Sequence, residues 1–284
     1  MVRRRYAEAV GKAANVTYRP IVDAFAAVPR ERFLFPGPWR LPLPASGALE
    51  DTPDADPRHV YVDRLIALDA SKNLNNGVPS FWASVFEHVR SAAGERAIHA
   101  GAGTGYYTAI LAHLVGQSGA VLGIEFEPHL AAHAAQAFAG QPNVEVLQGD
   151  ALSLARGNAD VIVASAGLDA IPLPWVHLLN DGGRLLIPLT APSAQFGEHI
   201  GGGAMLLIRR TGRAYAARFV GGTFIYHFMG ARSALSSERL ALAFADPTPS
   251  SDVRSLLLDD RPDETAWLVG DGWWLSTSSP RAVA

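Results

Sequence analysis

The chain has 284 residues, of which 49% are hydrophobic and 18% charged, and its formal net charge is −3. This composition suits one large domain, or one domain with an appendage, and offers no polycationic surface for nucleic acid. Cysteine is absent, which excludes disulfides, thiolate metal sites and a cysteine nucleophile. No apolar run has membrane-spanning length, and charges interrupt the stretch that follows the basic start. We therefore expect a cytoplasmic protein whose partner is neither a membrane nor a nucleic acid.

The first part of the chain is expected to form helices on either side of an irregular segment. Apolar residues recur at helical spacing within residues 1–35, which predicts two helices. Residues 36–59 hold six prolines and little periodicity, so we expect an irregular loop, followed by a short strand over 60–68. A polar stretch with three asparagines within residues 73–76 then leads to a predicted helix with Ser80 as its N-cap.

The strongest pattern lies near the middle of the chain. Residues 97–100 have strand character and lead into glycines at alternate positions, Gly101, Gly103 and Gly105, before an apolar helical run. Such a loop lets backbone approach a ligand, and the helix N-terminus presents free N–H groups. Glu125 follows 20 positions after the third glycine, behind a second apolar run, where a carboxylate would accept the two hydroxyls of a ribose.

Strands continue to alternate with predicted helices up to residue 189, with further strands at 144–147, 159–164 and 184–189. This alternation predicts an α/β fold with a doubly wound, mostly parallel, Rossmann-like sheet and helices on both faces. Ligands of such sheets bind at the carboxyl ends of the strands. Asp150 and Ser165 fall at these ends, as do the glycine loop and Glu125.

The last third of the chain predicts a β-rich extension. A hairpin is expected over residues 204–220, then a helix over 234–245, and short strands at 256–258 and 267–275. Trp267, Trp273 and Trp274 are expected to pack in the core, with a stacking surface as the alternative. The expected division is an N-terminal helical and substrate-side segment, a ligand-binding core and a C-terminal extension of unknown role, at residues 1–95, 96–231 and 232–284.

Three stretches resemble protein-L-isoaspartate O-methyltransferases, a branch of the class I S-adenosylmethionine (AdoMet) methyltransferases. Residues 19–33, with the string Val-Pro-Arg, are similar to that family's N-terminal helix and its exit. The spacing Gly-x-Gly-x-Gly and its Tyr-Tyr-Thr-Ala continuation at 106–109 are similar to its glycine loop. The string Gly-Gly-Arg-Leu-Leu-Ile-Pro at 182–188 is similar to its late strand, and the resemblance covers about residues 18–231.

The resemblance implies AdoMet as cofactor and a carboxylate oxygen as methyl acceptor. The glycines would wrap the methionine part, Glu125 would bind the ribose, and Asp150 with Ala151 would contact the adenine. His99 replaces an acidic residue common in the family, and is either a ligand contact or a buried histidine with a partner inside the protein. The cofactor-binding candidates are His99, Gly101, Gly103, Thr104, Gly105, Glu125, Asp150, Ala151 and Ser165.

Residues 75–80, which we call the acceptor segment, depart from the family. The family's pattern there is Gly-Gln-Thr-Ile-Ser-x-Pro-His. If Pro79 matches the family's proline, Gly77 takes the serine position and Ser80 the histidine position, so the family's hydroxyl is missing. The substrate-binding candidates are Asn75, Asn76, Gly77 and Ser80, with Asn76 as the catalytic candidate; the structural alternative is a tight turn.

Four functions fit these residues to different degrees. The first is an AdoMet-dependent O-methyltransferase acting on isoaspartyl carboxylates of peptides or proteins. The second is a relative that methylates another peptide or small-molecule acceptor, and the third is a non-catalytic AdoMet-binding module. NAD-dependent oxidoreduction is disfavoured because Tyr106 stands where the dinucleotide fingerprint has its third glycine. No histidine–carboxylate motif has metal-ligand spacing, so we expect no metal.

Overall fold

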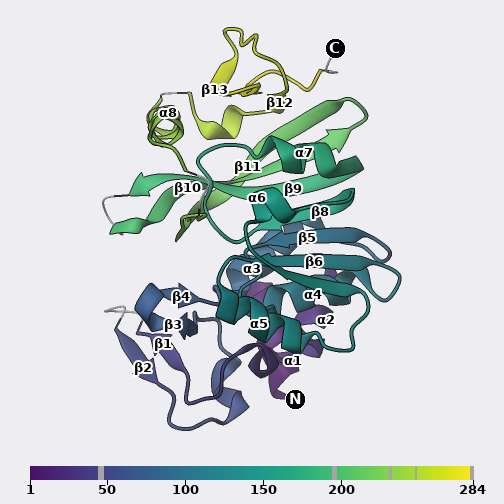
Figure 1. Cartoon of the computed structure of the whole chain (residues 1–284), viewed down its shortest axis with the longest axis vertical. Coiled ribbons are helices and arrows are strands. Elements are labelled where there is room, and N and C mark those ends of the chain that lie inside the picture. The colour runs from purple at the N-terminus through teal and green to yellow at the C-terminus, as the bar shows by residue number, and fades with distance from the viewer. Residues whose placement is uncertain (44–47, 194–196, 230–231, 247, 282–284) are drawn as a thin grey trace. The chain divides into compact units, whose positions relative to one another are not determined.

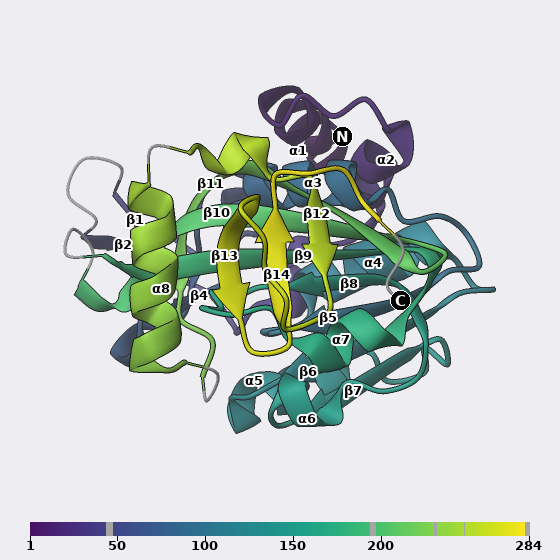
Figure 2. The same ribbon diagram turned by 90° about the horizontal axis from the view of Figure 1, so that it is seen from above.

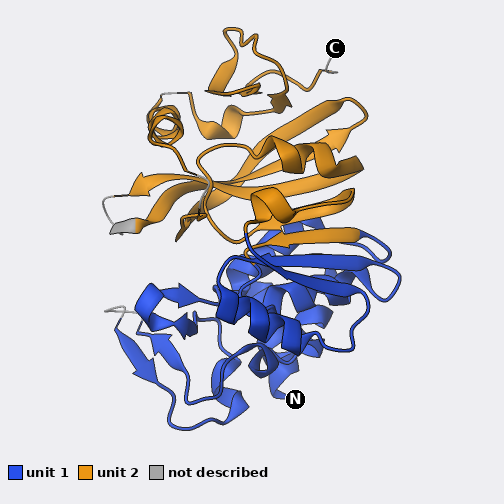
Figure 3. Ribbon diagram, viewed as in Figure 1, with its two compact units in different colours: residues 1–95, 102–149 blue, residues 96–101, 150–284 orange. Residues whose placement is uncertain are grey.

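The computed structural model describes residues 1–43, 48–193, 197–229, 232–246 and 248–281 (Figure 1). The chain forms two compact units, which Figure 3 shows in different colours. Unit 1 comprises Met1–Glu95 and Ala102–Gly149, and unit 2 comprises Arg96–Gly101 and Asp150–Ala284. The chain therefore changes unit three times, before Arg96, inside the glycine loop and just before Asp150.

Helices dominate the first part of unit 1. The two helices predicted near the N-terminus are α1 (Val2–Ala13) and α2 (Arg19–Ala27), which pack on each other. Both also pack on α3 (Pro79–Val89), and α2 packs on α4 (Tyr106–Val115) as well. The aromatic rings that join them belong to Tyr6, Phe25, Phe86, Tyr106 and Tyr107.

The first turn of α3 corrects the predicted N-cap. The helix begins at Pro79, so Ser80 lies inside its first turn and Val78 occupies the N-cap without a side-chain bond. Proline suits this first position because its missing N–H would have no helical partner. The backbone N–H of Ser80 donates instead to a carboxylate oxygen of Asp63 at 2.8 Å, so a residue distant in sequence caps the helix.

The segment between α2 and α3 is more regular than predicted. Strands β1 (Arg40–Pro42) and β2 (Leu49–Asp51) pair antiparallel within the supposed loop. The strand expected over 60–68 is wrong, because β3 (Ala67–Asp69) starts only at its end and pairs with β4 (Leu74–Asn75). Three short 3-10 helices complete the segment, namely η1 (Arg30–Phe33), η2 (Pro57–Val60) and η3 (Ala70–Lys72).

The tertiary contacts of this segment account for the difference. Leu34, Trp39, Leu41, Val60 and Ile66 form one buried cluster. Their apolar character therefore reflects packing between short elements rather than the alternation of one strand.

The rest of unit 1 is a strand–helix unit. Strands β6 (Ala120–Glu125) and β7 (Val144–Gln148) run parallel, as predicted. Helix α4 packs on β6, and α5 (Pro128–Ala137) packs on both strands. Glu125 is the last residue of β6, which places its side chain at the carboxyl end of a parallel strand.

Unit 2 begins with parallel strands in the order β5 (Arg96–Ala100), β8 (Ala159–Ala164) and β9 (Leu179–Ser193). The bounds of β8 match the prediction, because its continuous apolar run is typical of a buried strand. Helices α6 (Ala151–Leu154) and α7 (Leu173–Leu178) lie in the chain between Asp150 and β9.

The sheet of unit 2 then continues antiparallel through β10 (Gly197–Thr211) and β11 (Ala214–Tyr226). Both strands are longer than predicted. Strand β10 runs through a glycine cluster, and sequence propensity treats glycine as the end of a strand. A Cβ on Gly203 would lie 2.0 Å from the carbonyl oxygen of Leu189, so the close approach of these strands needs glycine there.

The C-terminal extension adds α8 (Ala234–Ala245) and three strands, β12 (Ser255–Leu257), β13 (Ala266–Gly270) and β14 (Trp273–Ser276). The strands continue the sheet beyond β11 in the order β12, β14, β13, and α8 packs on β9 and β13 (Figures 1 and 2). The predicted helix is confirmed. The single strand predicted over 267–275 is a hairpin, because Gly272 takes a positive φ of 77° in its turn.

Core packing of the extension's tryptophans is confirmed, since Trp267, Trp273 and Trp274 are all buried.

Among the helices of the described ranges, none is both long and apolar enough to cross a bilayer.

A buried carboxylate attaches α8 to the loop that follows β8. Asp169 is 2% exposed, and its Oδ2 accepts hydrogen bonds from the Ser233 N–H and the Ser237 hydroxyl, both at 2.8 Å. Arg232 donates to the Ser237 hydroxyl at 3.2 Å and to the Thr190 carbonyl at 2.7 Å. Burial lowers the pKa of Arg232, and the charge of Asp169 opposes that shift. The two charges therefore stabilise each other at the start of α8.

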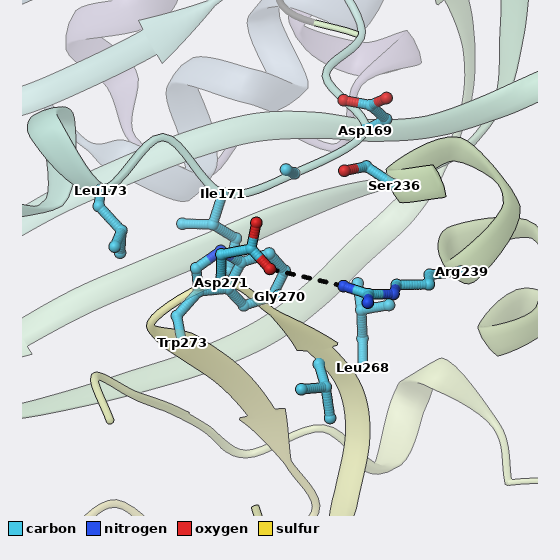
Figure 4. A pocket seen from close by; sticks show the side chains of 11 residues that line it. Asp169, Ile171, Leu173, Ser236, Arg239, Leu268, Gly270, Asp271 and Trp273 are labelled. Carbon is cyan, nitrogen blue, oxygen red and sulfur yellow. Dashed lines mark ion pairs between the residues drawn. The ribbon is translucent and has the colours of Figure 1, made fainter. Parts of the chain in front are cut away.

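Next to this network lies a cavity of about 220 Å³. It is bounded by the loop from Asp169 to Leu173, by α8 and by the β13–β14 hairpin (Figure 4). Across it, the guanidinium of Arg239 lies 3.6 Å from the carboxylate of Asp271, which is fully exposed. Asp169 therefore belongs to the part of the wall that holds α8, and Asp271 to the solvent-exposed rim.

We expect Asp169→Ala to destabilise the protein by about 2–3 kcal/mol, because it removes two hydrogen bonds and leaves the half-buried Arg232 without its compensating charge. Urea unfolding followed by circular dichroism measures this change. Asp271→Ala is the matched control, since its fully exposed carboxylate should be lost without measurable effect. Equal midpoints for Asp169→Ala and the wild type would contradict the role of this network.

Candidate functional site

The glycine loop has the backbone conformation that its sequence predicts. Gly101, Gly103 and Gly105 have φ values of 82°, 57° and 97°, which only glycine adopts at little cost. In unit 1, a Cβ on Gly105 would lie 2.7 Å from the ring of Phe138, so packing also requires glycine. A Cβ on Gly103 would meet only a methyl carbon of Leu68, at 3.8 Å. The backbone at Gly103 therefore borders open space.

Glu125 holds this loop from the end of β6. Its carboxylate is 7% exposed, and its two oxygens accept the backbone N–H groups of Gly103 at 2.6 Å and Glu127 at 2.9 Å. Burial raises the pKa of Glu125, and these backbone hydrogen bonds lower it. An ionised carboxylate has about four acceptor sites, and the hydrogen bonds from Gly103 and Glu127, with a weaker one from Phe126, do not use all of them. The chemistry of Glu125 thus fits a ligand that offers two hydroxyl groups, such as a ribose.

Thr104 is turned away from the open side of the loop. It is buried, and its hydroxyl donates to the carbonyl of Phe33 at the end of η1. Its side chain therefore anchors the loop to η1, which leaves its backbone as the part suited to ligand contact.

In unit 2, His99 and Ser165 form a hydrogen-bonded pair at the ends of β5 and β8. The His99 Nε2 lies 2.7 Å from the Ser165 Oγ, and the ring is 1% exposed. Burial lowers the pKa of His99 to about 3, so the ring is neutral at pH 7. A Cβ on Gly101 would lie 3.2 Å from that of Ser165, which places the serine directly against the first glycine. His99 therefore has a partner inside the protein.

Asp150 and Ala151 form the start of α6. The Asp150 Oδ1 accepts the N–H of Leu152 at 2.9 Å and caps the helix. The carbonyl of the buried Ala151 accepts from the indole N–H of Trp175 at 3.0 Å. Both residues of this predicted adenine contact thus make hydrogen bonds within unit 2.

The acceptor segment is a tight polar turn in unit 1. The Asn75 Oδ1 accepts the N–H of Gly77 at 2.9 Å, and the Gly77 carbonyl accepts from the Tyr107 hydroxyl at 3.2 Å. Gly77 has a φ of 71°, and a Cβ there would lie 2.6 Å from the indole nitrogen of Trp82. A serine does not fit at this position without a shift of Trp82, so the packing here requires glycine.

Asn76, the catalytic candidate, lies in the core with 7% exposure. Its Oδ1 accepts the backbone N–H of Ile66 and a guanidinium N–H of Arg30, both at 3.1 Å. Sequence reasoning missed Arg30 and also Tyr107, whose hydroxyl reaches the turn. Arg30 is the arginine of the string Val-Pro-Arg in the family resemblance, but nothing local reveals its distant partners.

In the residues that the structure describes, no group of three or more histidine and carboxylate side chains is arranged to hold a metal ion.

The fold and the glycine loop define a class. A strand, a left-handed glycine loop, a helix and an acidic residue at the end of the next strand are typical of Rossmann-like proteins that bind nucleosides. Residues 52–201, more than half of the chain, match the family described as protein-L-isoaspartate(D-aspartate) O-methyltransferase. The chain belongs to this family of methyltransferases.

Individual relatives agree with that assignment. Protein-L-isoaspartate O-methyltransferase 2 of Anaeromyxobacter sp. (strain Fw109-5) is 32% identical over 190 residues, which cover 66% of this chain and 69% of the relative. The enzyme of the same name from Archaeoglobus fulgidus is 29% identical over 191 residues, covering 66% and 78%.

Two solved structures share the fold. A protein-L-isoaspartate O-methyltransferase aligns with a TM-score of 0.63 at 19% identity, over 99% of this chain and 88% of its own. A putative one from Plasmodium falciparum, solved with S-adenosyl-L-homocysteine, has a TM-score of 0.58 at 14% identity, over 80% of this chain and 97% of its own. The expected Rossmann-like α/β fold and the family resemblance are therefore confirmed.

The depressed pKa of His99 predicts a pH dependence of stability. An unfolded histidine titrates near 6.5, whereas the folded ring resists protonation until about pH 3. The unfolded state therefore binds the extra proton first, and stability present above pH 6.5 is lost as the pH falls towards 3. Between pH 7 and pH 5 we expect a loss of about 2 kcal/mol from this ring alone.

Urea unfolding of the wild type and His99→Gln across this range isolates the effect, because the glutamine cannot titrate. The variant should lose less stability than the wild type between pH 7 and pH 5. Parallel pH profiles would show that the ring is protonated in the folded protein.

Proposed function

We propose that this chain transfers the methyl group of AdoMet to the side-chain carboxylate of an isoaspartyl residue in a peptide or protein. Family membership supports the reaction type. The observation that carries the proposal is the Glu125 carboxylate, which fixes Gly103 and keeps free acceptor sites at the end of β6. A cytoplasmic location stays part of the proposal.

The proposed cofactor contacts are those expected from the sequence, with roles adjusted to the geometry. The glycines offer backbone to the methionine part, and Glu125 accepts the ribose hydroxyls. Thr104 contributes backbone only, because its hydroxyl is used by Phe33. The Ser165 hydroxyl, oriented by the neutral His99, is a polar group for the amino-acid end. Asp150 and Ala151 offer the edge of α6 to the adenine.

The reaction asks little proton transfer of the protein. Bound AdoMet supplies a methyl group on a positively charged sulfur, which leaves as a neutral thioether when the new carbon–oxygen bond forms. The acceptor carboxylate is already anionic at pH 7, so no general base is required. What the chain must supply is alignment of the acceptor oxygen with the methyl carbon, a term that reaches several kcal/mol. Rigid placement of the turn at 75–77 serves that purpose.

For the acceptor side we propose Asn75, the backbone of Gly77 and Ser80, with Asn76 acting from the core. The Asn75 side chain and the Ser80 hydroxyl are partly exposed, whereas Asn76 is buried. Amide and hydroxyl groups can both donate to a carboxylate. They offer the hydrogen bonds that a serine at position 77 would otherwise supply.

Transfer of label from methyl-labelled AdoMet to an isoaspartyl peptide tests the proposal directly. We expect methylation of the isoaspartyl peptide and none of the matched aspartyl peptide, because the two place the carboxylate at different distances from the backbone. AdoMet binding without transfer to either peptide would reject the isoaspartyl acceptor and favour a different one. The absence of AdoMet binding would reject the cofactor site itself.

Glu125→Ala should weaken AdoMet binding, measured by calorimetry. Each hydrogen bond to a charged group is worth about 1.5–3 kcal/mol, so the dissociation constant should rise by roughly 10- to 100-fold. Glu127→Ala is the control, because that carboxylate pairs with Lys72 instead of the loop. Unchanged affinity in Glu125→Ala would contradict the ribose assignment.

A further inference from the structure

A fully buried guanidinium organises the acceptor side of unit 1. Arg30 is 0% exposed, and within the described residues no carboxylate lies within 4 Å of it. Its Nη1 donates to the carbonyls of Val60 and Val62, both at 2.8 Å. Its Nη2 donates to the carbonyl of Arg64 at 2.9 Å and to the Asn76 Oδ1 at 3.1 Å. A buried charge is costly unless it is hydrogen-bonded, so these four acceptors are tied to the position of Arg30.

These hydrogen bonds tie the acceptor segment, through Asn76, to the backbone at residues 60–64. The carbonyls of residues 60, 62 and 64 converge on one side chain, which curls the chain that leads to β3. Asn76 is also hydrogen-bonded to Ile66. Its Oδ1 accepts the backbone N–H of Ile66 at 3.1 Å, and its backbone N–H donates to the Ile66 carbonyl at 3.0 Å. Both partners of the Oδ1 are donors, which fixes the orientation of the amide. Asn76 is therefore held from two sides.

The other end of η1 contacts the glycine loop. The carbonyl of Phe33 accepts a hydrogen bond from the hydroxyl of Thr104. The centroid of the Phe33 ring lies 6.2 Å from that of Tyr106 and 5.4 Å from that of Phe138. Four consecutive residues thus contact the acceptor segment at one end and the loop at the other. The guanidinium of Arg30 also lies over the Tyr106 ring, 5.7 Å from its centroid.

We propose that Arg30 is a positioning residue for methyl transfer, which acts through Asn76 to set the acceptor segment relative to the glycine loop. This inference rests on the proposed function. Because the reaction depends on alignment, a displacement of about 1 Å in the acceptor segment is enough to slow transfer by up to about 100-fold. The loop keeps its own contacts with Glu125, so cofactor binding should not depend on Arg30.

The arrangement explains why arginine stands here. A guanidinium presents five donors in a rigid planar fork, and four contacts to acceptors are formed. Lysine keeps the charge but has three donors on a flexible stem, so it cannot hold the Val60, Val62 and Arg64 carbonyls and Asn76 together. Arg30→Lys therefore weakens the positioning with the smallest change in buried charge.

The test compares Arg30→Lys with Arg58→Lys, the same substitution at an exposed arginine of the same unit whose partner is the local Asp56. With isoaspartyl peptide and saturating AdoMet, Arg30→Lys should lower kcat by about 10- to 100-fold, whereas the AdoMet dissociation constant should stay within about twofold of the wild type. Arg58→Lys should leave both unchanged. Wild-type kcat in Arg30→Lys would overturn the proposal.

A double-mutant cycle with Asn76→Ala tests the route. If Arg30 acts through Asn76, both single variants lower kcat and the double variant is little worse than the poorer of the two. Multiplication of the two losses would show that the residues act independently and would overturn this route. A parallel loss of AdoMet affinity in either variant would reveal a general structural defect and reject positioning.

Hydrogen exchange separates this inference from the proposed function. In Arg30→Lys the amides of Ile66 and Asn76 should exchange at least about tenfold faster, while that of Gly103 keeps its protection. This readout needs no acceptor, so it stands if the wild type fails to methylate the isoaspartyl peptide. Unchanged protection at Ile66 and Asn76 would contradict the positioning role, whatever the acceptor.

Discussion

The hydrogen bond between the Glu125 carboxylate and the N–H of Gly103 is the interaction on which the nucleoside end of the proposed cofactor site depends. Left-handed glycines cost conformational entropy, and a loop that contains three of them is ordered only if the surrounding structure holds it. Glu125 supplies that constraint from a strand end, and Thr104 supplies a second through η1. The same carboxylate keeps acceptor sites for hydroxyl groups, so the group that shapes the loop also offers the contact that a ribose requires.

The acceptor segment is held by aromatic packing and by hydrogen bonds from distant side chains. Where the family resemblance leads one to expect serine, Gly77 packs against Trp82, and Trp82 stacks on Tyr107 with ring centroids 4.7 Å apart. The Tyr107 hydroxyl in turn reaches the Gly77 carbonyl. Gly77, where the resemblance implies serine, therefore lies against a packed aromatic cluster, with amide groups next to it. A buried hydrogen bond from Arg30 and a partly buried one from Tyr107 place this turn, which suits the proposed reaction because that reaction depends on alignment.

Local patterns predicted the parts of the fold that local physics decides. The apolar run of β8, the helix α8 and the glycine loop with Glu125 were all evident because each follows from residue type and spacing. The segment between residues 36 and 66 was predicted poorly because its order comes from Arg30 and from packing between short elements. Likewise Asn76 was predicted as a substrate-side amide or as part of a tight turn, since no sequence pattern tells which of three neighbouring asparagines meets a buried guanidinium.

The C-terminal extension is part of the same physical system as the strand ends of unit 2. It continues the sheet beyond β11, and the solved structure that aligns over 99% of this chain shares the fold through this region. Ser233, the N-cap of its helix α8, donates its backbone N–H to the buried Asp169, which lies four residues after Ser165. Ser165 is the residue that contacts His99. Because a buried carboxylate keeps its hydrogen-bond donors in place, the loop from Ser165 to Asp169 is fixed at both ends. The extension therefore restrains a loop that begins at a proposed cofactor contact, which gives its attachment a structural consequence for the site.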